Sequence, residues 1–300
     1  FNRANDQSRW QTAYEEMSKD LEVIDACGYG LYKSSNNVNG SDFARQFLVP
    51  AKHTEAVFVT LFNNISTNDG LDNQKNNSWE RSVRPANTGG GGKGASAMLV
   101  DMFPMADGKI PASAGTYTKL TPSALDYDAK VPFVNRDPRF YRTFGFPGFR
   151  WAYNGDASLR DSHNPSDGKN YILWNYVWYT EKNEQGDEFS GNSYAADNLL
   201  SSKQGVYVKK KSDDLDVNPS ALYTYVANDT KGSAPFYSAA PLLDMRYDEV
   251  LLNLAEFACG AGKMDVAVEQ LQKIRERAGY TAEAEYGLKS NLYSAPAACM

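Results

Sequence analysis

Residues 245–280 constrain the fold of this chain more than any other stretch. Apolar residues recur there at helical spacing in two runs, which are Tyr247, Val250, Leu251, Leu254, Ala255 and Ala258, then Met264, Ala267, Val268, Leu271, Ile274 and Ala278. Gly260 and Gly262 end the first run, and Gly279 ends the second. Two amphipathic helices joined by so short a loop must pack antiparallel, here through small alanine faces. The stretch therefore predicts a helical hairpin of about 34 residues, the size of a tetratricopeptide-type repeat.

The order of residues in this hairpin is also distinctive. It reads Arg-Tyr-x-Glu-Val-Leu-Leu-Asn-x-Ala-Glu, then a turn with glycine, then Ile-Arg-x-Arg-Ala-Gly. This pattern resembles the last helical repeat of SusD/RagB-like proteins, nutrient-binding outer-membrane lipoproteins of Bacteroidetes. The matching residues are Arg246, Tyr247, Glu249, Val250, Leu251, Leu252, Asn253, Ala255, Glu256, Ile274, Arg275, Arg277, Ala278 and Gly279. Asp248 and Phe257 stand where the family more often has Ala, so we expect a slightly changed helix face.

Two further segments resemble the family in the same order along the chain. Residues 98–109 (MLVDMFPMADGK) resemble its Leu-x-Asp-x-Phe…Asp-Gly-Lys segment, and residues 135–140 (NRDPRF) resemble its Arg-Asp-Pro-Arg-Phe stretch, which leads into a strand. Asp137 before proline favours a turn. We expect Arg136 and Arg139 to brace this corner by local pairing rather than to bind a ligand, since planar guanidinium groups often serve that role.

Other parts of the sequence predict further elements. Residues 8–24 predict an amphipathic helix that begins with a capping box formed by Ser8 and Gln11. Residues 56–62 alternate as in a strand. The polar residues 63–94 predict a long loop. Residues 205–211 predict a strand whose three final lysines form a solvated edge.

The resemblance implies a mostly α fold, with tetratricopeptide-like helical repeats in a SusD-like α/α superhelix and a long loop-rich insertion containing short strands. We expect residues 1–300 to be a single SusD-like domain and a fragment of a longer protein. Its expected parts are a helical repeat part over 8–30, the insertion with the candidate ligand surface over 31–240, a helix-turn-helix repeat over 241–280 and a truncated tail over 281–300.

Aromatic residues make up 13 % of the chain, and many gather between residues 149 and 179. Exposed Trp and Tyr rings can stack on the apolar face of a sugar, whereas buried rings fill a core. Trp174, Tyr176 and Trp178 alternate, so they would share one face of a strand. Residue chemistry and loop placement give as candidate stacking rings Trp151, Tyr153, Trp174, Trp178 and Trp79, and as candidate hydrogen-bonding residues Arg150, Asp161 and Asn164.

Composition and motifs argue against several other classes of protein. The net charge of −6 disfavours a nucleic-acid partner, because phosphate binding needs a basic surface. The three cysteines form no CxxC pair, so neither a zinc site nor a disulfide framework is indicated. Residues 89–94 spell G-x-G-x-x-G without a preceding buried strand. Residues 214–218 have calcium-loop spacing, but Pro219 replaces the required glycine. We expect no cofactor and no metal.

Catalysis is also disfavoured by the residues present. Hydrolysis of a glycan needs two carboxylates that flank the scissile bond. Glu249 and Glu256 can share one helix face, but we expect them to pair with Arg246 or Arg275. No serine-hydrolase or zinc-protease motif is present in the sequence. We therefore expect a binding protein and not an enzyme.

The resemblance implies non-catalytic capture of an oligosaccharide or polysaccharide for uptake through a SusC-like TonB-dependent transporter. It also implies a lipoprotein of the cell outer membrane, surface-exposed or facing the periplasm, held by an N-terminal lipid anchor that this chain does not include. The alternative is a helical-repeat scaffold that binds a peptide, protein or glycoprotein, with the aromatic rings buried as core. The two readings differ in whether those rings face water.

Overall fold

The computed structural model describes more than half of the chain, in segments. Main chain and side chains are described for residues 6–38, 40–49, 52–63, 77–83, 92–111, 122–127, 133–146, 206–212 and 238–281, apart from the side chains of residues 81 and 97. The backbone alone is described for residues 150–152, 170–172, 181–182, 188–189, 223–228 and 232–237.

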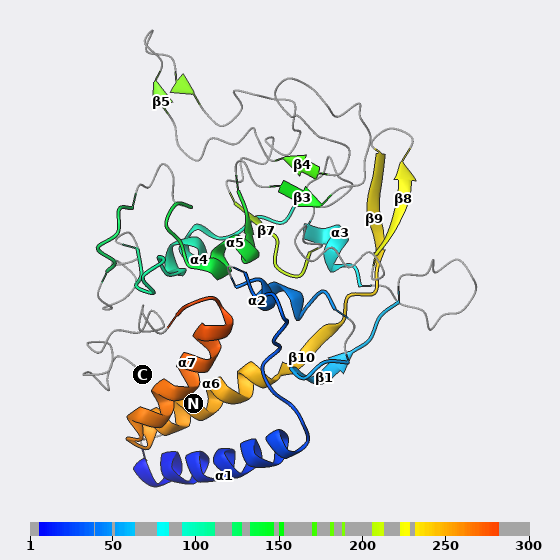
Figure 1. Cartoon of the computed structure of the whole chain (residues 1–300). Helices are drawn as coiled ribbons and strands as arrows, with labels where there is room; N and C mark the ends of the chain where they lie inside the picture. The colour runs from blue at the N-terminus through cyan, green and yellow to red at the C-terminus, as the bar shows by residue number, and fades with distance from the viewer. Residues whose placement is uncertain are drawn as a thin grey trace.

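Three helices lie side by side at one end of the molecule (Figure 1). Helix α1 (Gln7–Ala26) packs along α6 (Tyr247–Gly260), and α6 forms an antiparallel hairpin with α7 (Met264–Arg277). Gly262 turns the chain between α6 and α7 with a φ of 76°, a left-handed conformation that glycine adopts without steric cost. The predicted helical hairpin is confirmed.

Small side chains form the contact between these helices. Ala255 and Ala258 of α6 are buried against Ala267 of α7, and Tyr14 of α1 packs on the same cluster. A second cluster nearer the other end of the hairpin consists of Tyr247, Leu251 and Ile274, with Leu21, Ile24, Tyr29, Leu31 and Val57 packed against it. The alternation of small and large apolar residues therefore fixes how closely the three helices approach.

The start of α1 differs from the prediction. Asp6, and not Ser8, is the N-cap: its carboxylate accepts hydrogen bonds from Ser8 N at 3.0 Å and from Ser8 Oγ at 2.7 Å. Gln11 donates to Glu15 at 2.7 Å, so the predicted capping box is wrong. A carboxylate at this position satisfies the free amides and also interacts favourably with the helix dipole.

Gly260 allows α1 to lie against the end of α6. A Cβ atom at Gly260 would overlap the Trp10 indole. We expect Gly260→Ala to displace this ring and to lower the free energy of unfolding by about 1–2 kcal/mol, the usual cost of overpacking. Gly30→Ala is the control, since a Cβ there would meet nothing within 4 Å. Urea unfolding followed by tryptophan fluorescence measures both variants, and equal midpoints would contradict the close contact.

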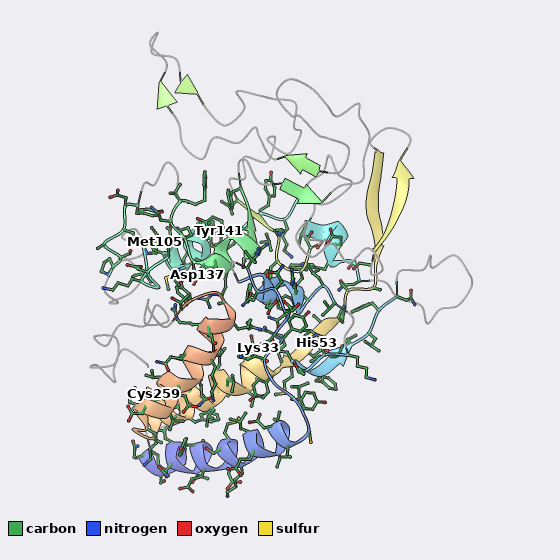
Figure 2. The ribbon with its side chains drawn as sticks, in the orientation of Figure 1. Lys33, His53, Met105, Asp137, Tyr141 and Cys259 are labelled. Carbon is green, nitrogen blue, oxygen red and sulfur yellow. The ribbon has the colours of Figure 1, made fainter. Side chains whose placement is uncertain are left out.

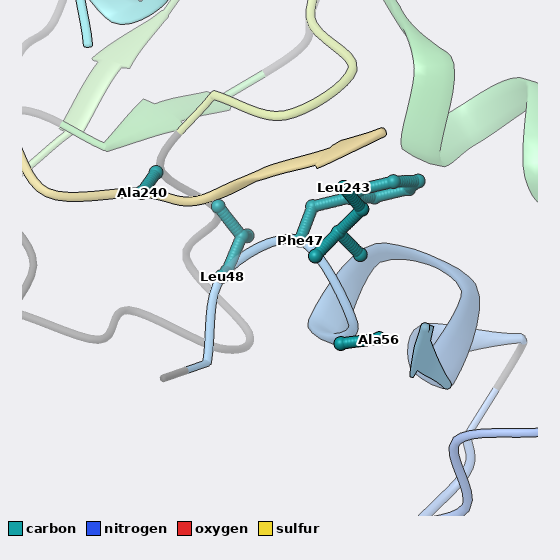
Figure 3. Packing of buried hydrophobic residues seen from close by; sticks show 5 residues of the cluster. All are labelled: Phe47, Leu48, Ala56, Ala240 and Leu243. Carbon is teal, nitrogen blue, oxygen red and sulfur yellow. The ribbon is translucent and has the colours of Figure 1, made fainter. Parts of the chain in front are cut away.

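A two-stranded antiparallel ladder connects the helical end to the rest of the chain. Strand β1 (Ala56–Thr60) pairs with β10 (Leu242–Arg246), which runs directly into α6. The predicted strand is thus confirmed over its first five residues. Figure 3 shows the core beside this ladder. Phe47 and Leu48, which follow α2 (Ser41–Arg45), pack there with Ala56, Ala240 and Leu243.

A second packed region lies beyond the end of α7. Helices α4 (Ala97–Met102) and α5 (Pro138–Thr143) meet there with strands β2 (Phe144–Gly145) and β7 (Tyr207–Val208), which pair antiparallel. Its buried residues are Val100, Phe140, Phe144 and Val206, and Phe103, Phe133 and Phe146 pack against them. The region is an aromatic core, with ring centroids of Phe103 and Phe144 separated by 5.0 Å.

Two local predictions in this part are wrong. The predicted loop over residues 63–94 contains helix α3 (Trp79–Val83). The predicted turn at Asp137 is instead the start of α5: Asp137 is the N-cap and accepts from Arg139 N at 2.7 Å. Pro138 takes the first helical position, where its missing N–H is no loss. The strand expected to follow is present as β2.

The remaining described strands form short ladders. Strand β3 (Arg150–Ala152) pairs with β4 (Asn170–Ile172), β5 (Glu181–Lys182) with β6 (Glu188–Phe189), and β8 (Tyr223–Asn228) with β9 (Gly232–Ser238), all antiparallel. Every sheet in the described part of the chain has two strands. The predicted architecture, mostly helical with a loop-rich insertion that holds short strands, is confirmed. None of the described helices has the length and apolar character needed to cross a membrane.

Candidate functional site

A buried network of charges lies where the helical hairpin meets β1 and α2. Arg277, at the end of α7, donates through Nη1 to Glu55 at 2.5 Å and through Nη2 to Asp248 at 3.1 Å. Arg246 donates through Nη1 to the same oxygen of Asp248 at 2.5 Å. The side chains of Glu55 and Arg277 have exposed fractions of 0 % and 1 %. This network joins Glu55, directly before β1, to the end of β10, to α6 and to α7, and of its four charged side chains only Arg246 is appreciably exposed.

Burial sets the protonation behaviour of this network. Loss of hydration raises the pKa of the Glu55 carboxyl, while the positive charge of Arg277 opposes that effect. Tyr32 N donates to Glu55 Oε2 at 2.7 Å and also favours the ionised form. Asp248, which stands where the resembling family more often has Ala, is the second carboxylate that Arg277 requires. The changed helix face predicted from the sequence is therefore an ion-pair site.

A second buried cluster fixes the corner at Asp137. Arg139 donates through Nε and Nη2 to the Asp137 carboxylate, and the Tyr280 hydroxyl donates to Asp137 Oδ2 at 2.6 Å. Burial alone would raise the pKa of Asp137, but the hydrogen bonds and charge of Arg139 and the bond from Tyr280 lower it overall. Figure 2 shows Asp137 beside Met105 and Tyr141, above the C-terminal end of α7.

Arg136 serves the same corner. Its Nη2 donates to the backbone carbonyls of Val100 and Phe103, the latter at 2.9 Å, and its guanidinium lies 4.5 Å from the Phe140 ring centroid. Both arginines of the NRDPRF segment are therefore used inside the fold. The predicted structural role of this segment is confirmed.

The lysines after β7 do not form a solvated edge, so that prediction is wrong. Residues 209–212 close a turn in which Ser212 N donates to Lys209 O at 2.8 Å, and Lys209 is only 3 % exposed. The amides of Lys209 and Lys210 donate to Thr143 O at 2.7 and 3.0 Å, which docks the turn on α5. Lys210 and Lys211 are half-buried against Phe47, at 5.3 Å from each Nζ to the ring centroid. Contacts with distant parts of the chain therefore bury these lysines, although a run of lysines after a strand usually faces solvent.

Burial is the main influence on Lys210. Loss of hydration and the nearby charges of Arg246 and Lys211 lower the pKa of Lys210 to about 8, although Asp248 opposes them. Burial also lowers the pKa of Lys211, again with Arg246 adding to the effect, while Asp244 opposes it. A half-buried lysine whose pKa is lowered by burial and by nearby like charges is a candidate for a functional group.

Trp79, one of the candidate stacking rings, lies beside this turn. Its Nε1 donates to Lys210 O at 2.7 Å, and Lys93 Nζ lies 5.0 Å from its ring centroid. The ring is half-buried. Trp79 thus anchors the turn that carries Lys210 and leaves part of its ring exposed.

Arg150 and Trp151 lie in β3, and the backbone register sets Trp151 opposite Tyr171 of β4. This pairing joins two parts of the aromatic-rich segment that the sequence indicated as a ligand surface. The other candidates, Tyr153, Asp161, Asn164, Trp174 and Trp178, lie outside the described residues. The structure therefore brings residues 150–152 and 170–172 of this aromatic-rich segment into one ladder.

Glu249 and Glu256, the carboxylates considered for catalysis, do not pair with Arg246 or Arg275. Glu249 and Glu256 are exposed on α6. Arg246 pairs with Asp248, and Arg275 donates to Gly108 O at 3.5 Å and lies over the Tyr280 ring, so the pairing predicted for the two glutamates is wrong. Across the described segments, no group of three or more His, Cys, Asp or Glu side chains is placed to hold a metal ion.

Sequence reasoning missed Glu55, Lys210 and Lys211. One signal was present for the buried network: Asp248 stands next to the apolar positions of α6 and departs from the family pattern. No such signal marks the lysines, because a run of three lysines after a strand usually faces solvent.

Comparison with known proteins gives a consistent result. The sequence model of the SusD family matches residues 54–291. A SusD-like protein from Bacteroides fragilis has a similar structure, with a TM-score of 0.55 at 17% identity, over 95% of this chain and 49% of that one. The structure of the protein BT4246 is similar too, with a TM-score of 0.55 at 17% identity, over 98% of this chain and 51% of that one. No curated protein sequence matches.

The chain spans about half the length of these solved structures. At such low identity the structural likeness shows the fold, which is SusD-like. The family match covers well over half of the chain and includes the helical hairpin, the NRDPRF corner and the lysine turn. The chain therefore belongs to the SusD family.

Proposed function

We propose that this chain captures an oligosaccharide or polysaccharide at the cell surface without cleaving it. The observation that carries the proposal is the family match over residues 54–291, since SusD-like proteins are binding proteins rather than enzymes. The captured glycan would then pass to a SusC-like TonB-dependent transporter. Because of the same family match, we also propose that the chain acts at the outer membrane as part of a lipoprotein.

The arrangement of the fold supports separate roles for a helical scaffold and for an insertion that binds the ligand. We assign residues 8–30 and 241–280 to the helical scaffold and residues 31–240 to the insertion that carries the ligand surface. The scaffold is tied internally by alanine packing and by the ion pair of Arg277 with Asp248, and Arg277 also ties it to Glu55 of the insertion. A rigid scaffold that presents a variable insertion is a common way to position a binding surface. Trp151, in the β3–β4 ladder, is the central stacking ring of this proposal, with Tyr153, Trp174 and Trp178 from the same segment.

Affinity electrophoresis against a panel of soluble polysaccharides tests the proposal. We expect one class of polysaccharide to retard the protein, and we expect no new reducing ends when that polysaccharide is incubated with it. Bovine serum albumin is the control for nonspecific retardation. Migration unchanged by every polysaccharide would argue against glycan capture, and release of reducing ends would argue for an enzyme.

A peptide or protein ligand is the second candidate. It is favoured by exposed apolar side chains on the β1–β10 ladder and just after it, namely Phe58, Leu61, Leu242 and Met245. Phe58 and Leu61 are 66% and 73% exposed, and contiguous exposed apolar side chains often mark protein interaction sites. Binding of a tryptic peptide mixture in place of every polysaccharide would favour this candidate.

A further inference from the structure

Four cationic side chains converge on two phenyl rings at the junction of α2, α6 and the turn over residues 209–212. The centroid of the Phe47 ring lies 5.3 Å from Lys210 Nζ, 5.3 Å from Lys211 Nζ and 5.2 Å from the Arg246 guanidinium carbon. Lys210 Nζ also lies 5.2 Å from the Phe43 ring, and the Arg277 guanidinium carbon 5.8 Å from it. We call Lys210, Lys211 and Arg246 the cation cluster.

The charges in this cluster are not balanced. Arg246 and Arg277 are matched by Glu55 and Asp248, two cations against two carboxylates. Within the described residues, no carboxylate lies within ion-pair distance of Lys210 or Lys211. Asp244 and Asp248 act on the two lysines only at longer range, and Asp244 accepts from Thr60 Oγ1 at 2.7 Å. Among the described residues, these two half-buried positive charges therefore have contacts with phenyl rings but no ion-pair partner, an arrangement that costs stability.

The backbone is also held in an unfavourable conformation to present one of these lysines. Lys211 has a φ of 66°, in the left-handed region that favours glycine. Residues kept in such conformations cluster at binding and switch sites, where the surrounding structure stabilises them. The depressed pKa of Lys210 is a further sign that its charge lacks compensation.

We propose that the cation cluster binds an oxyanion, a carboxylate or sulfate group carried by the captured ligand. This inference deepens the proposed function and rests on it for the identity of the ligand as a glycan, here an acidic one. An oxyanion offers several acceptor lone pairs, which suit two ammonium groups and a guanidinium group at once. Lys210, Lys211 and Arg246 are half-buried, so each keeps part of its surface in contact with solvent.

Trp79 places the cation cluster next to a candidate sugar-stacking ring. Its indole N–H donates to the backbone carbonyl of Lys210, so the ring is joined to the backbone of the turn that carries both lysines. A sugar stacked on the exposed part of Trp79 would carry its acidic substituent toward the same turn. Arg246 is fixed in turn by Asp248 and by Gln46 Oε1 at 3.2 Å, and it serves as the preorganised member of the site.

The test compares the wild type with Lys210→Met and Lys211→Gly, and with Lys263→Met as the matched control. Lys263 is exposed in the loop between α6 and α7, remote from the cation cluster. The first measurement is the melting temperature against sodium sulfate at constant ionic strength set with sodium chloride. We expect both cluster variants to melt about 2–4 °C higher than the wild type without sulfate, because an uncompensated charge or a strained backbone is removed. We expect millimolar sulfate to raise the melting temperature further, up to a plateau, only in the wild type and the control.

The second measurement is calorimetric titration with three oligosaccharides of equal length: one uncharged, one with uronic acids and one with sulfate esters. We expect an acidic oligosaccharide to bind about tenfold or more tightly than the uncharged one, and each cluster variant to lose that advantage. The preferred acidic oligosaccharide identifies the group as carboxylate or sulfate. The affinity for the acidic oligosaccharide should fall as the pH rises through about 8, because Lys210 then loses its proton. The charged groups that act on Lys210 are Lys211, Arg246, Arg277 and Asp248.

The outcomes separate this inference from the proposed function. Equal affinity for all three oligosaccharides, in wild type and variants alike, would overturn the oxyanion site and leave glycan capture intact. Saturable sulfate stabilisation lost in both cluster variants, with no oligosaccharide bound, would support the oxyanion site and overturn glycan capture. Sulfate effects equal in all four proteins would mean general salt stabilisation and would overturn the site.

Discussion

Arg277→Met is expected to lower the free energy of unfolding by about 3–5 kcal/mol, which makes it the most damaging single change that the structure predicts. Arg277 is 1 % exposed and is hydrogen-bonded to both Glu55 and Asp248. Methionine keeps much of the apolar stem but leaves two buried carboxylates facing one another with only Arg246 between them. Chemical unfolding at pH 7, followed by far-UV circular dichroism, measures the loss.

The pH dependence of this variant provides a second readout. Burial already raises the pKa of Glu55, and loss of Arg277 removes the charge that opposes this effect. A carboxyl whose pKa is raised in the folded state stabilises the fold as the pH falls and it takes up a proton. The deficit of Arg277→Met should therefore be smaller at pH 5 than at pH 7.

Two further variants make the Arg277 test specific. Arg9→Met is the control, because Arg9 pairs with Asp6 at 3.4 Å on the surface and its side chain is 61% exposed. We expect no measurable change from it. The double variant Glu55→Gln with Arg277→Met should be less damaging than the sum of the two single changes. Additive effects, or an Arg277→Met variant as stable as the wild type, would contradict the buried network.

Asp137→Ala is expected to lower the free energy of unfolding by about 3 kcal/mol. Three interactions end on this fully buried carboxylate: the cap of α5, the ion pair with Arg139 at 2.5 Å and the hydroxyl of Tyr280 at 2.6 Å. A lost cap costs about 1 kcal/mol, and the unpaired Arg139 and Tyr280 account for the rest. Because Tyr280 follows α7, the change should also loosen the contact between the hairpin and the aromatic core. Thermal unfolding of the variant measures the effect.

Asp137→Asn separates charge from capping. Asparagine retains an acceptor for the amide of Arg139, so this variant should lose less stability than Asp137→Ala. The pKa of Asp137 is lowered in the fold, so its charge contributes stability above pH 3.8 that is lost as the pH falls below that value. The difference between wild type and Asp137→Asn should thus shrink on acidification. A difference independent of pH would show that the ionised carboxylate is not what holds this corner.

Local sequence pattern was sufficient for the three long helices and for the packing between them. Periodic apolar residues placed α6, α7 and α1 within a few residues of their observed ends. The alanines of α6 and α7 predicted close helix contact, and Ala255, Ala258 and Ala267 form it. The internal use of Arg136 and Arg139 also followed from the proline corner, since guanidinium groups beside a turn tend to pair locally.

What the sequence could not predict depends on partners far away in the chain. Glu55 and Arg277 are separated by more than two hundred positions in the sequence, so no local pattern could predict their ion pair. The lysines after β7 look like a solvated strand end, but Phe43 of α2 and Phe47 just after it, from a distant part of the chain, pack against them. Trp79 was selected for its ring, whereas its bond to Lys210 O depends on the fold around the turn. Of the proposed aromatic surface, the structure describes Trp79 and the backbone of the β3–β4 ladder.

Glycan capture through the insertion is tested most directly by tryptophan fluorescence titration of the wild type and Trp151→Ala with the polysaccharide that retards the protein most. Trp10→Phe is the matched control, because Trp10 packs on α6 in the helical scaffold. The account predicts saturable binding by the wild type and the control, and binding at least about tenfold weaker in Trp151→Ala at an unchanged unfolding midpoint, as expected when a stacking ring is lost. Equal affinity in all three proteins, or no saturable binding by the folded wild type, would contradict it.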